Sequence, residues 1–268
     1  MRRLSTFNIV SLTLGFAFLY IPMIVVIVYS FNESRLVTVW GGFSTKWYGE
    51  LLRNEAFLDA AWVTFKVGFF SSIIATVLGT MGAYVLVRGG RFFGRTLFSG
   101  MIYAPLVMPE VITGLSLLLL FISIGLDRGL FTIILAHATF SMCYVSVVVS
   151  SRLVSFDRSV EEAALDLGCT PFEAFRLVTL PIIAPAVISG WLLALTLSLD
   201  DLVIASFVAG PSATTLPIKV FSSIRLGVSP EINALSTILI SLVTVGTIAA
   251  SLTTKRAVSR RNRDARMH

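Results

Sequence analysis

Long apolar runs alternate with short polar segments along most of the chain. Six of these runs reach the roughly 20 residues that an α-helix needs to cross the hydrocarbon core of a membrane. They cover residues 9–31, 60–87, 97–124, 130–151, 182–209 and 232–254. The pattern has neither the alternation of a half-buried strand nor a heptad repeat. The sequence therefore predicts an all-α transmembrane bundle of six spans that forms a single domain over residues 1–268.

The composition favours the same class of protein. Hydrophobic residues make up 56% of the 268 residues and charged residues only 13%, whereas soluble domains have about 25% charged residues. Cys143 and Cys169 have no metal-ligand spacing, and His137 stands alone within an apolar run, so we expect free thiols and a packing histidine. The sequence contains no Walker lysine motif, zinc-ligand cluster or nucleophile constellation. We therefore do not expect this chain to be an enzyme or to hold a cofactor or metal of its own.

The polar segment 152–181 separates the fourth apolar run from the fifth. Ser159 and Thr170 are each followed by a glutamate three residues later, which is the spacing of a capping box. Gly168 suits the end of one short helix and Pro171 the first position of the next. The segment therefore predicts a hairpin of two short helices between two membrane spans.

One face of the first short helix is expected to meet another protein. Ala163, Ala164 and Leu167 form a shallow apolar strip, and small side chains let a partner surface approach closely. A DNA-reading helix-turn-helix is the alternative. It is disfavoured because acidic residues outnumber basic ones in the hairpin, and phosphate binding needs the opposite balance. The acidic residues are Asp157, Glu161, Glu162, Asp166 and Glu173, against Arg152, Arg158 and Arg176.

The distribution of basic residues predicts the orientation in the membrane. Fourteen Lys and Arg residues fall on the side that holds both termini, the loop before residue 97 and the hairpin, and seven fall on the other side. Segments rich in Lys and Arg stay in the cytoplasm. We therefore expect the hairpin and both termini to be cytoplasmic.

Three carboxylates lie within apolar runs, where ionisable residues are functional candidates. Glu110 follows Pro105 and Pro109, and it would lie about 18 Å beyond Phe98 on a continuous helix, near mid-membrane. The prolines would bend that helix where it lines a cavity. We expect Glu110 to line the path of a cationic solute. The alternative is a structural carboxyl that is paired or protonated.

The other two carboxylates, Asp200 and Asp201, fall near the outer end of the fifth run. Adjacent residues point about 100° apart on a helix, so at most one of them would face a lumen. We predict that they belong to the same cationic path as Glu110. The alternative is a polar helix end in contact with water or with Arg225.

The hairpin also resembles a known family. Its residues Glu162-Ala163-Ala164, Gly168 and Leu180-Pro181 match the EAA loop of permease subunits in binding-protein-dependent ABC importers, with Val178 where that pattern usually has isoleucine. In that family the loop docks in a groove of the cytoplasmic ATPase. The resemblance thus implies that these six residues couple the chain to an ATPase.

Other segments extend the resemblance over nearly the whole chain. Residues 29–32, 105–110, 113–117 and 198–204 are similar to permease subunits of putrescine and spermidine importers, most of all the shorter, putrescine-side permease. The resemblance implies the type I ABC importer permease fold in a bacterial inner membrane. It also implies a heterodimer with a second permease, a cytoplasmic ATPase dimer that binds ATP and magnesium, and a periplasmic polyamine-binding protein. Membrane lipid would surround the chain, and no nucleic acid is expected as a partner.

Two other functions stay open at this point. One is a permease of the same fold for another solute, although the scarcity of Lys and Arg within the spans disfavours an anion. The other is an ion-coupled secondary carrier with Glu110 as its proton site. The sequence does not decide between putrescine and spermidine.

Overall fold

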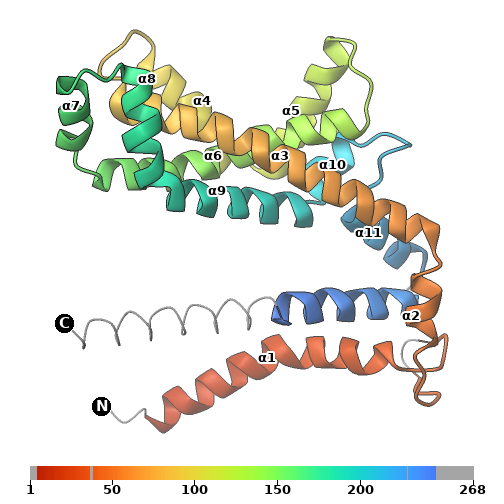
Figure 1. The fold of residues 1–268 in the computed structure, drawn as a ribbon. Helices are drawn as coiled ribbons and strands as arrows, with labels where there is room; N and C mark the ends of the chain where they lie inside the picture. The colour runs from red at the N-terminus through yellow and green to blue at the C-terminus, as the bar shows by residue number, and fades with distance from the viewer. Residues whose placement is uncertain (1–4, 37–38, 228, 246–268) are drawn as a thin grey trace. The chain divides into compact units, whose positions relative to one another are not determined.

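A computed structural model describes residues 5–36, 39–227 and 229–245 (Figure 1). These residues are mainly helical, and the β-type pairing among them is one isolated bridge between Asn32 and Phe43. The chain forms two compact units. One unit is Met1–Glu55 together with Ser222–His268, and the other is Ala56–Phe221.

The first unit contains α1 (Thr6–Ser30), α2 (Lys46–Leu51) and an apolar helix over Pro230–Val245. The indole N–H of Trp47 donates to the carbonyl of Asn32 at 2.7 Å, and the Tyr48 hydroxyl lies 2.7 Å from Ser30 Oγ. These bonds hold α2 against the end of α1. The rest of the last predicted span, which was to run to residue 254, lies outside the described residues.

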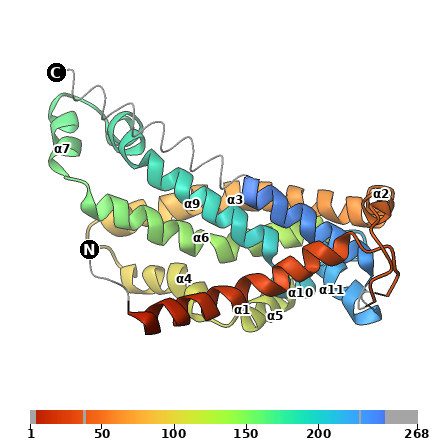
Figure 2. The ribbon, with the colours of Figure 1, turned by 90° about the horizontal axis from the view of Figure 1, so that it is seen from below.

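The second unit is built on α3 (Glu55–Arg88), α6 (Leu130–Ser155) and α9 (Leu180–Asp200). Helix α9 runs along α6, as Figure 2 shows. Small residues allow the close approach, which is how helices associate within lipid. An added Cβ at Gly79 of α3 would lie 2.6 Å from the Met142 carbonyl oxygen of α6, and one at Gly190 of α9 would lie 3.1 Å from a methyl of Val145.

The run predicted as one span over 97–124 consists of two helices, with a sharp break at the prolines that were predicted to bend it. Helix α4 (Arg95–Val107) and α5 (Glu110–Ser123) meet at an angle of 119°. Met108 between them is extended, with φ −75° and ψ 136°. Pro109 explains the break, since proline lacks an N–H and disfavours the helical conformation of the residue before it.

The run predicted over 182–209 is also divided. Helix α9 ends at Asp200, Asp201 is extended, and α10 (Val203–Val208) follows. Helix α10 packs against α5, where a Cβ at Gly114 would lie 2.7 Å from the Phe207 ring. Helix α11 (Leu216–Leu226) comes next along the chain.

The remaining long helices agree with the sequence. Helices α1, α3 and α6 occupy the runs predicted over 9–31, 60–87 and 130–151. Among the described residues, four helices are long and apolar enough to cross a membrane, and the bent pair α4–α5 adds a fifth if it is one broken span. The count of six spans stays a prediction.

Candidate coupling hairpin and acidic sites

The hairpin consists of α7 (Ser159–Asp166), α8 (Pro171–Ala174) and a π-helix, η1 (Phe175–Thr179), which continues into α9. Figure 1 shows α7 and α8 at the end of the second unit where α6 stops and α9 begins, the end opposite α10. A π-helix inside an α-helical stretch often marks a functional position. The hairpin is therefore joined without a loop to one of the long helices.

Helix α7 begins with a different cap from the predicted one. Ser159 is its first residue, and the Ser159 N–H donates to the Asp157 carboxylate at 3.0 Å. The predicted Ser159 capping box is therefore wrong, because the carboxylate two residues earlier takes that N–H. This bond lowers the pKa of the exposed Asp157 carboxyl. The resulting stabilisation is present above the ordinary pKa of aspartate and is lost as the pH falls through the lowered value.

The turn between the short helices follows the sequence prediction. Gly168 has φ +92°, a conformation that L side chains rarely adopt, and the described residues leave open space around its Cβ position. Glycine is thus required by the backbone and not by crowding. Thr170 and Glu173 form a reciprocal capping box, with Thr170 N–H to Glu173 Oε2 at 2.8 Å and Glu173 N–H to Thr170 Oγ1 at 3.3 Å. Pro171 is the first residue of α8, as predicted.

The apolar strip predicted on α7 is only partly correct. Ala164 is buried against the rest of the chain, whereas Ala163 and Leu167 are exposed, Leu167 at 87%. Phe172 of α8 is 70% exposed. We call Glu162, Ala163, Leu167 and Phe172 the exposed face of the hairpin.

The two neighbouring glutamates of α7 have opposite environments. Glu162 is exposed and pairs with Arg158, the residue just before α7, with 3.1 Å between Oε1 and Nε. Glu161 is buried, and its Oε2 lies 2.8 Å from Arg88 Nε at the end of α3. Its other oxygen accepts the Thr179 hydroxyl at 2.8 Å. Glu162 therefore does not form the predicted cap, and its contact with a partner stays a prediction.

The last two residues of the EAA-like motif, Leu180 and Pro181, lie in different environments. Leu180 packs against a core that includes Val149, Leu153 and Ile183, whereas Pro181 is exposed. Leu180 therefore fixes the start of α9.

Glu110 lies at the break between α4 and α5. It is the first residue of α5 and is exposed. A carboxylate is favoured at a helix N-terminus, where backbone N–H groups point outward. The estimate of about 18 Å beyond Phe98 assumed a continuous helix, and α4 ends before Glu110, so the position near mid-membrane stays a prediction.

The two aspartates after α9 differ as sharply as the two glutamates. Asp200 is exposed, and the side chain of Asp201 is buried. Asp201 Oδ1 accepts the Ala205 N–H at 2.8 Å, which caps α10, and lies 3.4 Å from His137 Nε2. His137 Nδ1 lies 2.7 Å from Ser198 Oγ, which in turn accepts the Ser71 hydroxyl at 3.0 Å. A buried polar chain thus links α3, α6 and α9 to the start of α10.

Comparison with known proteins decides the family. The model of the inner-membrane components of binding-protein-dependent transport systems matches residues 77–263. The chain belongs to this family. Over 97% of its length it is 57% identical to the putrescine transport system permease protein PotI of Escherichia coli K12, covering 95% of that protein. It is 44% identical to the spermidine/putrescine transport system permease protein PotC of the same strain, over 90% of this chain and 91% of the relative.

Solved structures share the fold of this permease. A bacterial ABC transporter involved in the import of the acidic polysaccharide alginate has a TM-score of 0.70 at 19% identity and covers 92% of this chain and 94% of its own. The MetNI methionine ABC transporter, in an inward-facing form, has a TM-score of 0.58 at 18% identity. The match covers 81% of this chain and 99% of the transporter chain. The predicted type I ABC importer permease fold is confirmed, and the chain is a multi-pass inner-membrane protein.

Sequence reasoning missed three residues of this permease that share one buried contact: Arg88, Glu161 and Thr179. Glu161 and Ala164 are three residues apart, so helical periodicity would have placed both on the inner face of α7. Arg88 and Thr179 carried no local signal, since their partners are distant in the sequence.

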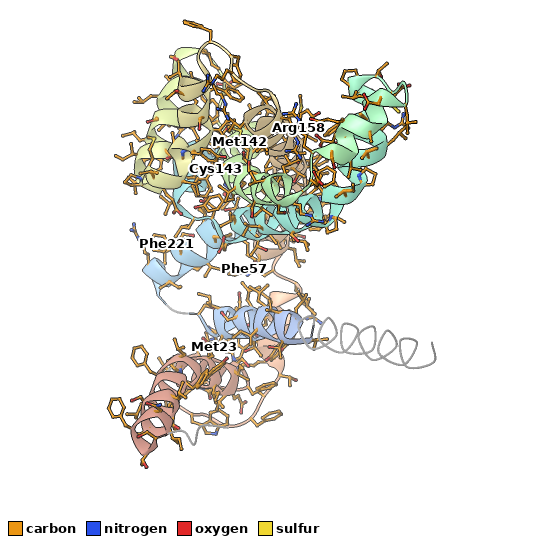
Figure 3. The ribbon with its side chains drawn as sticks, turned by 90° about the vertical axis from the view of Figure 1, so that its left-hand side faces the viewer. Met23, Phe57, Met142, Cys143, Arg158 and Phe221 are labelled. Carbon is orange, nitrogen blue, oxygen red and sulfur yellow. The ribbon has the colours of Figure 1, made fainter. Side chains whose placement is uncertain are left out.

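The cysteines of this permease are free thiols, as predicted. Cys143 follows Met142 on α6 (Figure 3), and its thiol donates to the Phe140 carbonyl at 2.8 Å in the interior. Cys169 is half-buried beside the Gly168 turn.

Proposed function

We propose that this chain is the membrane-spanning subunit of an ABC importer that moves a polyamine, chiefly putrescine, across the bacterial inner membrane into the cytoplasm. The single observation that carries the proposal is 57% identity, over nearly the full length, to a putrescine permease. Spermidine is the second candidate substrate, because a spermidine/putrescine permease is 44% identical. Both solutes are cations, which agrees with exposed carboxylates next to helix breaks.

The exposed face of the hairpin is proposed to dock on a cytoplasmic ATPase. Leu167 and Phe172 expose large apolar side chains on a short polar segment, and such exposure marks a site of protein contact. Glu162 and Ala163 lie beside them on α7. The ATPase dimer would bind ATP and magnesium, and its closure would move the hairpin. The charge count supports a cytoplasmic position for the hairpin and for both termini.

The solute path is proposed to use Glu110 and Asp200, whose carboxylates are exposed at two helix breaks. A dication that leaves water needs compensating negative charge, which these groups would supply. Asp201, also assigned to the path from the sequence, would act by holding the α9–α10 break in place. A second permease would complete the path, and a periplasmic binding protein would deliver the polyamine.

Uptake in whole cells tests this function against its alternatives. Cells that lack other polyamine importers would express this permease together with a second permease, an ATPase and a periplasmic binding protein. Putrescine uptake should be lost when the ATPase carries a substitution that abolishes ATP hydrolysis, and excess unlabelled sulfate or amino acids should not compete. Uptake that persists with the inactive ATPase and follows the proton gradient would instead make the chain a secondary carrier.

A further inference from the structure

The buried pair of Arg88 and Glu161 holds the hairpin to the long helices. Helix α7 has eight residues, too few to be stable alone in water, so tertiary contacts must set its direction. It buries two side chains, Glu161 and Ala164. An alanine contact is small and non-directional. The direction of α7 therefore depends mainly on the Glu161 carboxylate.

Arg88 holds that carboxylate through an ion pair and is itself held by a hydrogen bond to the turn after α6. Its Nε lies 2.8 Å from Glu161 Oε2, and its Nη2 donates to the Phe156 carbonyl at 3.3 Å. The guanidinium carbon also lies 5.7 Å from the centre of the Phe156 ring. Because one guanidinium group pairs with the Glu161 carboxylate and bonds to the Phe156 carbonyl, the end of α3, the turn after α6 and the start of α7 are held together.

Thr179 brings a fourth element into the contact. Its hydroxyl donates to Glu161 Oε1 at 2.8 Å, and the residue is fully buried at the end of the π-helix. Leu180 follows and starts α9, which packs along α6. Movement of α7 would therefore pull on the start of α9 as well as on α3. Glu162 next to it has no such effect, because its partner Arg158 is the residue that caps the same helix.

We propose that Arg88, Glu161 and Thr179 form a coupling clasp that transmits motion of the docked hairpin to α3, α6 and α9. The proposal rests on the proposed function, in which an ATPase moves the hairpin. The three are positioning residues: they do not touch the ATPase or the solute. Without the clasp, the hairpin could still dock and ATP could still be hydrolysed, but less of that motion would reach the helices that open the path.

The test measures putrescine taken up per ATP hydrolysed by the complete transporter in proteoliposomes. We expect Arg88→Gln and Glu161→Gln each to lower this ratio by about tenfold, within the range for residues that carry coupling between sites. Thr179→Val should lower it less, since it removes one hydrogen bond and leaves the ion pair. The matched control is Arg91→Gln, an exposed arginine three residues after Arg88, which should leave the ratio unchanged. The ATPase should co-purify with every variant.

The double variant Arg88→Gln/Glu161→Gln separates coupling from folding. It leaves no unpaired buried charge, so it should assemble at least as well as either single variant. Its loss of coupling should equal that of one single variant, because residues in direct contact are not additive. A double variant that does not assemble, effects that add fully, or single variants with the wild-type ratio would each overturn the clasp. Failure of the wild-type complex to take up putrescine would instead refute the proposed function.

Discussion

His137 Nε2 lies 3.4 Å from Asp201 Oδ1, with both side chains buried. The contact joins the middle of α6 to the extended residue between α9 and α10. Asp201 also caps α10 by accepting the Ala205 N–H at 2.8 Å. Buried polar groups are costly unless they are bonded, and here the carboxylate is bonded to that N–H while the imidazole Nε2 faces it without an aligned hydrogen bond. The carboxylate that sequence reasoning assigned to the solute path is thus part of the scaffold in this structure.

The first prediction concerns this contact. Asp201→Ala should lower the free energy of unfolding by about 1–3 kcal/mol, since it leaves the Ala205 N–H without its acceptor and removes the carboxylate that faces the buried imidazole. Asp200→Ala removes the neighbouring exposed carboxylate and should change stability little. Thermal unfolding of the two purified variants in the same detergent checks this. Equal midpoints for the two would show that Asp201 does not hold the break.

The second prediction concerns the turn of the hairpin. Gly168→Val should reduce binding-protein-stimulated ATP hydrolysis and uptake, because a β-branched residue in the left-handed region costs about 1–2 kcal/mol or more. Gly168→Asn should retain most of both activities, since asparagine tolerates this conformation. The space around the Cβ is open, so the two variants differ in backbone preference and not in clash. Normal uptake by the valine variant would show that transport does not depend on the geometry of this turn.

The third prediction concerns topology. In a background with Cys169→Ser, a cysteine at exposed Ser212 should react with a membrane-impermeant maleimide in intact cells. A cysteine at Leu167, which is 87% exposed, should react only after permeabilisation. The remaining native thiol, Cys143, is buried and should not react with the maleimide. Labelling of Leu167→Cys in intact cells would show that the orientation is opposite to the one that the charge count predicts.

The fourth prediction concerns the solute path. Glu110→Gln should lower putrescine uptake by about three- to tenfold, because a unit charge at contact contributes on the order of 1 kcal/mol even where water is present, and more where it is scarce. The amide keeps the shape of the side chain. Asp127→Asn, at an exposed acid between α5 and α6, is the matched control, and the affinity of the external binding protein should not change. Wild-type uptake by Glu110→Gln would make that carboxylate structural.

The helical fold could be predicted from hydrophobic run length, and the prolines predicted a bend before Glu110, but the 119° angle of that break and the break at Asp201 could not be predicted. Pro109 and the Asp200–Asp201 pair were both visible in the sequence. The apolar runs nevertheless continue across both positions, because hydropathy depends on side-chain polarity and not on the direction of the backbone. Pro105 and Pro185 lie within helices, so proline alone does not locate a break.

Some residues of the candidate sites could likewise be predicted from the sequence and others could not. Local signals predicted the Gly168 turn and the Thr170 cap, whose partners are three residues away or fewer. Glu161 and Asp201 owe their roles to Arg88 and His137, which are more than 60 residues away in the sequence. Such pairs depend on helix packing, which no local pattern encodes, and the adjacent residues Glu162 and Asp200 look equivalent until the fold is known.

The most direct test of the account is putrescine uptake by proteoliposomes that contain this permease, its partner permease and the ATPase, with the binding protein outside. With ATP and magnesium enclosed, labelled putrescine should accumulate inside against its gradient. Accumulation should stop when ATP is replaced by a non-hydrolysable analogue, and an imposed proton gradient without ATP should not drive it. Accumulation driven by the proton gradient alone, or ATP hydrolysis that putrescine-loaded binding protein does not stimulate, would contradict the account.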